Sequence, residues 1–94
     1  MNAVPRLTSY RNPWHHPGSN TREDYSTDKP GIAHAGCMIY HVLPEQWDVV
    51  KAGCCITQRA GLGGAKLCAE AVVDLIAPTP DDVHERMLEK HGHL

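Results

Sequence analysis

The sequence contains no phenylalanine, and its aromatic side chains are limited to three tyrosines and two tryptophans. Large aromatic residues supply much of the surface that a domain buries, so a chain of 94 residues with so few of them has a thin core. Such a chain lies at the small end of what one hydrophobic core can stabilise. We therefore expect a single domain that gains stability from a second copy, as a homo-oligomer such as a homodimer.

Clusters of charge and long apolar runs are also missing. Nine Lys and Arg residues are interspersed with eleven Asp and Glu residues, for a formal net charge of −2. Sequence-independent DNA binding needs a basic cluster, so we do not expect nucleic acid as a partner. The chain has no apolar run of the roughly twenty residues that a membrane helix needs, and its first residues lack the apolar segment of a signal peptide. We therefore expect a cytoplasmic protein without a membrane partner.

The cysteines are few and are not arranged as a disulfide framework. Four of them allow two disulfides in three connectivities. In a reducing cytoplasm, small buried thiols are the better interpretation. They are Cys37, Cys54, Cys55 and Cys68.

Residues 1–31 contain four of the seven prolines and few apolar residues. Proline fixes φ and removes a backbone donor, so we expect an extended arm. The arm nevertheless carries the aromatic residues Tyr10, Trp14 and Tyr25. It either covers the domain with these side chains or presents them to a partner.

Within residues 36–76 the spacing of apolar residues changes. It is about two in the first part, as in a strand, and about 3.6 in the second part, as in a helix. Three segments of alternating side chains predict short strands, and Lys51–Gly53 has the form of a hairpin turn in which Gly53 takes a positive φ. Pro44-Glu45 separates the first two strands. The predicted strands are Cys37–Leu43, Trp47–Lys51 and Cys54–Gln58.

The period of about 3.6 predicts an amphipathic helix over Gly64–Ile76, which Pro78 ends. Thr79 and Pro80 are signals for the start of a second, short helix, and Gly92 stops it. The sequence therefore predicts an α+β fold in which one helix packs on a small antiparallel three-stranded sheet, with an extended N-terminal arm over 1–31 and a short C-terminal helix. The sheet and helices occupy residues 32–94.

A glycine-rich turn joins the last predicted strand to the helix. Such a turn can hold an anion with backbone N–H groups, and the residues available for it are Arg59, Gly61, Gly63, Gly64 and Lys66. A phosphate-binding loop would follow its lysine with Ser or Thr, whereas Lys66 is followed by Leu67. A tight reversal is therefore the preferred interpretation, and a small module that sequesters an anion or nucleotide is the alternative.

His34 and Cys37 have a spacing that suits a metal ion. A structural zinc site normally has a second close pair of ligands, which this chain does not offer, so a zinc-stabilised module is a further alternative and we expect no cofactor. A cysteine nucleophile would need a histidine and a cleft around it. No such constellation can be assembled from the sequence, so we do not expect an enzyme.

The segments WDVVKAG, Trp47–Gly53, and GAKLCAE, Gly64–Glu70, lie within this sheet-and-helix pattern. The pattern resembles small accessory proteins encoded by bacteriophages and prophages, among them anti-CRISPR inhibitors built on a similar antiparallel sheet and helix. The resemblance covers about half of the chain and concerns its architecture, and no functional residue is carried over. It implies a viral anti-defence protein in the cytoplasm of a bacterial host cell.

These observations predict a non-enzymatic binding protein that blocks a host defence protein by steric occlusion. Interface energy is concentrated in a few Trp, Tyr and Arg side chains, and the arm holds such residues. The predicted partner-binding residues are Tyr10, Arg11, Trp14, His15, Arg22 and Tyr25.

Overall fold

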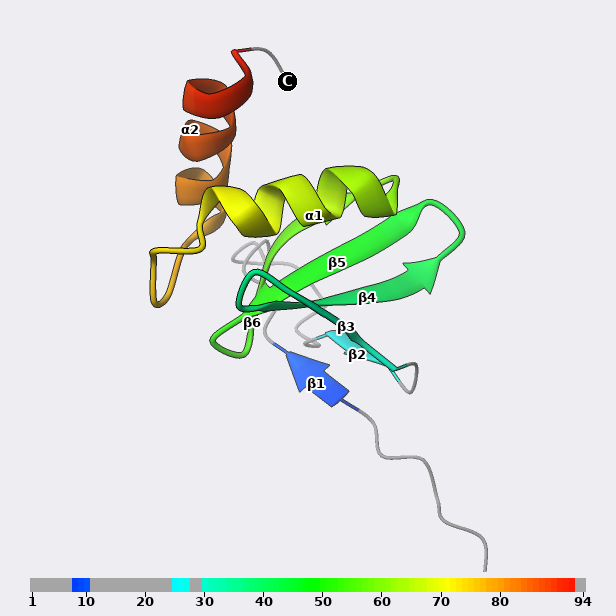
Figure 1. Ribbon diagram of the computed structural model, residues 1–94. Helices are drawn as coiled ribbons and strands as arrows, with labels where there is room; N and C mark the ends of the chain where they lie inside the picture. Colours follow the sequence, from blue (N-terminus) through cyan, green and yellow to red (C-terminus); the bar gives the residue numbers. More distant parts are fainter. Residues whose placement is uncertain (1–7, 11–24, 28–29, 93–94) are drawn as a thin grey trace, which may run out of the picture.

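The computed structural model describes Thr8–Tyr10, Tyr25–Thr27 and residues 30–92 (Figure 1). Four strands form an antiparallel sheet in the order β3-β4-β5-β6, and two more form a separate antiparallel pair, β1-β2. The elements are β1 (Thr8–Tyr10), β2 (Tyr25–Thr27), β3 (Ile32–His34), β4 (Cys37–Leu43), β5 (Gln46–Lys51), β6 (Cys54–Arg59), α1 (Leu62–Ala71) and α2 (Pro80–His91).

The four-stranded sheet lies between two layers. Figure 1 shows α1 along one face of the sheet and the β1-β2 pair beyond the opposite face. On the helix side, Ile39, Val49 and Ile56 are completely buried, and burying each such side chain contributes about 1.5–3 kcal/mol. The core on the other side is smaller and consists of Tyr10, Tyr40, Val50 and Cys55.

The α+β class is confirmed, but the predicted sheet of three strands is wrong. The fourth strand, β3, has only three residues, of which none is buried, so it has no hydrophobic pattern of its own. It is held by a two-residue turn to β4, in which Ala35 has φ 50° and Gly36 has φ 79°. Two consecutive positive φ values are typical of the tight hairpin turns that match the twist of paired strands.

The prediction of a single packing helix is also corrected. Val83 and Met87 of α2 are 1% and 3% exposed and belong to the same core as α1. The capping signals are confirmed, because Asp82 N donates to Thr79 Oγ1 (3.2 Å) and Thr79 N donates to Asp82 Oδ2 (2.8 Å). Gly92 ends α2 with φ 76°. Neither of the helices in the described residues is long and apolar enough to cross a membrane.

Helix α1 covers Leu62–Ala71 rather than the predicted Gly64–Ile76. At its end the N–H of Val72 bonds to Ala69 O, and the N–H of Leu75 bonds to Val72 O. These bonds join residues three apart, which is the tighter pattern common at helix ends. Residues after Val72 therefore form an irregular connection to α2 instead of a further helical turn.

The described parts of the N-terminal arm are paired strands. The register of β1 and β2 places Thr8 opposite Thr27 and Tyr10 opposite Tyr25. Because the pairing is antiparallel, the chain leaves β1 at Tyr10 and returns at Tyr25 beside it. The two ends of the intervening segment are thus held together.

Candidate functional site

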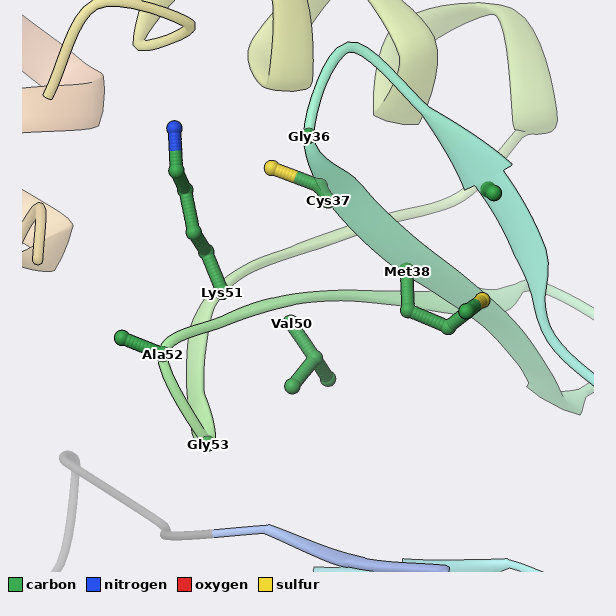
Figure 2. A pocket seen from close by; sticks show the side chains of 8 residues that line it. Gly36, Cys37, Met38, Val50, Lys51, Ala52 and Gly53 are labelled. Atoms are coloured by element: carbon green, nitrogen blue, oxygen red, sulfur yellow. The ribbon is translucent and has the colours of Figure 1, made fainter. Parts of the chain in front are cut away.

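Two hollows open on either side of the β5–β6 turn, and Lys51 and Ala52 line both of them. The first, which we call the turn hollow, has a volume of about 430 Å³ and lies between the β3–β4 turn and the β5–β6 turn (Figure 2). The second, the proline hollow, has a volume of about 250 Å³ and lies between the β5–β6 turn and Ala77–Pro80. Both hollows are at the same end of the sheet.

The rims of the turn hollow are two tight hairpin turns. In the β5–β6 turn Ala52 has φ 54° and Gly53 has φ 74°, so the predicted turn and the positive φ of Gly53 are confirmed. Ala35 and Ala52 hold a left-handed conformation that costs a residue with a side chain about 1–2 kcal/mol. Cross-strand pairing on both sides keeps these turns in place, so the rims are fixed by the sheet.

Lys51 connects the β5–β6 turn to helix α1. Its Nζ donates to Val72 O at 2.9 Å and to Val73 O at 3.2 Å. These carbonyls are at the C-terminal end of α1, where a cation is stabilised by the helix dipole, and α1 has no basic residue of its own in its last turn. The ammonium of Lys51 is therefore engaged in a structural contact.

Replacing Lys51 by Met, which keeps the apolar stem, is expected to lower the free energy of unfolding by about 2 kcal/mol. Hydrogen bonds from a charged donor contribute about 1.5–3 kcal/mol, and the helix terminus loses its cation. Lys66→Met makes the same chemical change in the middle of α1 and is expected to cost under ~0.5 kcal/mol. Urea denaturation of the two variants measures the difference, and equal losses would contradict the proposed role of Lys51.

The turn hollow also contains a cysteine, but one that is protonated at neutral pH. Figure 2 shows the side chains of Cys37 and Lys51 on one side of the strands and those of Met38 and Val50 on the other. Burial raises the pKa of the Cys37 thiol, and the nearby ammonium of Lys51 offsets only part of that effect. Because the thiolate and not the thiol is the nucleophile, we interpret Cys37 as a core residue and not as a reactive cysteine.

The glycine turn leads directly into the first turn of α1, which begins at Leu62. Gly61 caps the helix in an extended conformation without a side-chain hydrogen bond. Arg59 does not point away from the fold, since its Nε donates to Cys68 Sγ at 3.1 Å. Its side chain also lies against Gly64, where an added Cβ would be 3.8 Å from Arg59 Cβ. Of the predicted anion-binding set, Gly63, Gly64 and Lys66 are residues of α1 and Arg59 is bonded to Cys68, and the anion-binding alternative stays a prediction.

The two residues of the predicted metal pair are engaged in different surroundings. His34 and Cys37 are opposite each other in the β3–β4 register, but His34 Nε2 bonds to Glu70 Oε2 at 2.5 Å and the Cys37 thiol is buried in the core. In the part of the chain that the structure describes, no three His, Cys, Asp or Glu side chains are grouped to hold a metal ion. The described residues thus give the zinc alternative no support.

The predicted partner-binding residues fall into three groups. Tyr10 is only 3% exposed, so it is a core residue of this structure and not an exposed anchor. Tyr25 is its neighbour in the β1-β2 pair. The remaining four lie outside the described residues and are Arg11, Trp14, His15 and Arg22.

Tyr10 lies against the sheet, where it contacts Tyr40 and Asp48. Its ring stacks on Tyr40 with a centroid separation of 5.5 Å and an interplanar angle of 10°. Its hydroxyl donates to Asp48 Oδ2 at 2.8 Å, and Gln46 Nε2 donates to the other carboxylate oxygen at 3.0 Å. Asp48 is completely buried, so Tyr10 supplies one of the hydrogen bonds that its carboxylate needs away from water.

Sequence reasoning missed the role of Asp48. A signal was available, because Asp48 alternates with Trp47 and Val49 and shares its strand face with Val50. A carboxylate on an apolar strand face needs a donor from another segment. The sequence could not indicate which segment supplies it, since Tyr10 is 38 residues away.

The connection between α1 and α2 exposes apolar side chains beside the proline hollow. Ile76 is 89% exposed and Val73 is 55% exposed, and the following residue, Ala77, lines the hollow. We call this surface, formed by Val73, Ile76 and the proline hollow, the apolar corner. Both exposed residues follow the end of α1 at Ala71.

Comparisons of the chain with protein-family models, curated proteins and solved structures found no match.

Proposed function

We propose that this protein acts by binding another protein, as a small inhibitor that blocks a host defence protein by steric occlusion. The observation that carries the proposal is the attachment of the arm to the sheet through Tyr10. Binding residues are typically placed on loops that a rigid scaffold positions. The Tyr10 contacts with Tyr40 and Asp48 provide such a scaffold for the chain that follows β1.

The β1-β2 pairing adds to this argument. Residues 11–24 leave the pair at Tyr10 and return to it at Tyr25. Fixing both ends of a binding segment lowers the ordering cost that association must overcome. The proposed contact residues in this segment are Arg11, Trp14, His15 and Arg22, which carry the side-chain types that dominate interface energy. Tyr10 has the role of an internal anchor.

The test is affinity capture from a bacterial lysate with the wild-type protein and with Trp14→Ala. We expect the wild type to retain a host protein in stoichiometric amount. We expect Trp14→Ala to lose it with the melting temperature unchanged, because loss of a central aromatic anchor costs 2 kcal/mol or more of binding energy, about 30-fold in affinity.

Leu67→Ala is the matched control, since Leu67 is an exposed apolar residue of α1 on the opposite side of the sheet from β1. Two results would overturn the proposal. One is retention of the same host protein by Trp14→Ala. The other is unfolding of Trp14→Ala, which would make Trp14 part of the core.

A further inference from the structure

We propose that Met38 is a site of oxidative modification, at which a peroxide converts the thioether to a sulfoxide and thereby loosens the β1-β2 pair from the sheet. Met38 belongs to β4. It is opposite Val50 in the register, and Val50 packs in one core with Tyr10, so Met38 lies on the face of the sheet that the β1-β2 pair covers. This inference does not depend on the proposed inhibitory function.

The first argument is access to the sulfur atom. Met38 is 36% exposed, whereas Met87 is 3% exposed and belongs to the core between the sheet and the helices. Met38 also lines the turn hollow, whose volume is about 430 Å³, many times the ~30 Å³ that a water molecule occupies in the liquid. Hydrogen peroxide is only slightly larger than water, so the hollow admits it to the thioether.

The second argument is the position of the sulfur atom in the fold. A Cβ added at Gly31 would be 2.5 Å from Met38 Sδ and 2.8 Å from Tyr40 Cε1. Figure 2 shows the thioether extending from β4 toward β3, and it fills the space beside Gly31, just before β3 begins. Both atoms are close to that one point, so the sulfur is no more than about 5.3 Å from the edge of the Tyr40 ring. Sulfur–aromatic contacts have this separation, ~5 Å, and often lie at the ring edge.

The third argument is that Tyr40 is the ring on which Tyr10 of β1 packs. The two rings stack with a centroid separation of 5.5 Å, and the Tyr10 hydroxyl donates to the buried Asp48. The core on this side of the sheet is the smaller of the two, so a change beside Tyr40 affects a large share of it. Loss of the Met38 contact therefore weakens the attachment of the β1-β2 pair and leaves the core under α1 intact.

The reaction transfers one oxygen atom from the peroxide to sulfur. A lone pair of Met38 Sδ attacks one oxygen of hydrogen peroxide, and the oxygen–oxygen bond breaks as the sulfur–oxygen bond forms. The second oxygen leaves as water after proton transfer, so sulfur is oxidised by two electrons and the peroxide is reduced by two. A flexible apolar thioether becomes a polar, chiral sulfoxide, which methionine sulfoxide reductases convert back. Such a polar group disfavours the apolar contact with Tyr40, and the modification is therefore a reversible switch.

Peptide mass spectrometry of the folded protein after treatment with hydrogen peroxide tests the site. We expect the mass of one oxygen atom to be added at Met38 at least about tenfold faster than at Met87, because a buried thioether is reached only through openings of the core. Protein denatured in guanidinium is the control and should be oxidised at both positions at similar rates. Equal rates in the folded protein, or faster oxidation of Met87, would overturn the proposal.

Hydrogen exchange of the backbone amides tests the consequence for the arm. We expect the amides of Thr8–Tyr10 and Tyr25–Thr27 to exchange about three- to tenfold faster after oxidation, the change that corresponds to loss of one sulfur–aromatic contact. The amides of β5 should keep their exchange rates. Methionine sulfoxide reductases that act on the two sulfoxide epimers should restore slow exchange in the arm. Unchanged exchange of the β1-β2 amides, or equal acceleration in β5, would show that the modification does not loosen the arm.

Substitutions separate the effect of Met38 from that of the four cysteines, which peroxide also oxidises. Met38→Leu keeps an apolar side chain of similar volume and is expected to make exchange in the arm insensitive to peroxide. Met87→Leu is the matched control and should respond to peroxide as the wild type does. Met38→Gln imitates the polar sulfoxide and should accelerate exchange in the arm without peroxide. A response to peroxide that persists in Met38→Leu would assign the effect to the cysteines and reject the switch.

Discussion

Tyr10→Phe is expected to lower the free energy of unfolding by about 2 kcal/mol, although it removes a single oxygen atom. The hydroxyl of Tyr10 donates to a carboxylate that is completely buried, and hydrogen bonds to charged groups contribute about 1.5–3 kcal/mol. The lost donor cannot be replaced by water, because Tyr10 is 3% exposed. Tyr10→Ala also loses the stacking on Tyr40 and is expected to cost about 3–5 kcal/mol. Such a loss is a large share of the 5–15 kcal/mol typical of a small domain.

Two further variants separate the hydrogen bond from general effects of substitution. Tyr40→Phe removes a hydroxyl from the ring that stacks on Tyr10 and is expected to cost less than about 1 kcal/mol. In a double-mutant cycle of Tyr10→Phe with Asp48→Asn, the two changes should show a coupling energy of about 1–2 kcal/mol. Urea denaturation of all four proteins gives that energy. A coupling energy near zero would show that Tyr10 and Asp48 do not stabilise each other.

The parts of the fold that the sequence predicted correctly are those with local signals. The cap at Thr79, the stop at Gly92 and the β5–β6 turn at Gly53 each depend on a few neighbouring residues. The same is true of the longer strands β4, β5 and β6, where side chains alternate over six or seven residues. Local chemistry is sufficient for such features, because capping and turn geometry need no distant partner.

The parts that were missed depend on contacts between distant segments. Strand β3 is too short to show a pattern and exists because it pairs with β4. The β1-β2 pair joins residues from both ends of the arm, and its anchor is the contact between Tyr10 and Asp48. The predicted end of α1 was wrong for a related reason. The carbonyl of Val72, just after the helix, accepts a hydrogen bond from Lys51, which belongs to strand β5.

The candidate sites follow the same division. The sequence indicated which residues could bind an anion or a metal, but not that Arg59 would bond to Cys68 or that His34 would bond to Glu70. It also did not indicate that Ile76 would be 89% exposed. The residue type limits which ligands a side chain can bind. The tertiary contacts determine which of these side chains are already bonded within the fold.

Raising the pH above about 9 is expected to destabilise the fold steeply. Burial raises the pKa of the thiols of Cys37, Cys55 and Cys68 above the value of 9.0 that applies to an exposed thiol. The carboxylate of Asp48 raises the pKa of Cys55 further. Lys51 beside Cys37 and Arg59 beside Cys68 offset only part of the effect of burial. The folded state therefore keeps three protons that the unfolded chain releases.

The direction of the effect follows from this difference in bound protons. A group whose pKa is higher in the folded state than in the unfolded state stabilises the fold fully at pH values below its unfolded pKa. That stability is lost as the pH rises from the unfolded pKa through the folded pKa. Each thiol contributes at most about 1.4 kcal/mol per pH unit, so the three together approach about 4 kcal/mol per pH unit. Burial and the hydrogen bond to Asp48 also raise the pKa of Tyr10 above 10.0, which adds to the loss at higher pH.

Urea denaturation in the presence of a phosphine reductant, at a series of pH values from neutral to alkaline, measures this slope. Cys55→Ala removes one of the three thiols and is expected to reduce the slope by about one third, because one fewer proton is then released on unfolding. Thiolate absorbance, recorded on the same samples, should rise together with the loss of circular dichroism. The opposite result, in which all four thiols ionise near pH 9 while the circular dichroism of the folded state persists, would show that Cys37, Cys55 and Cys68 are not buried as the structure places them.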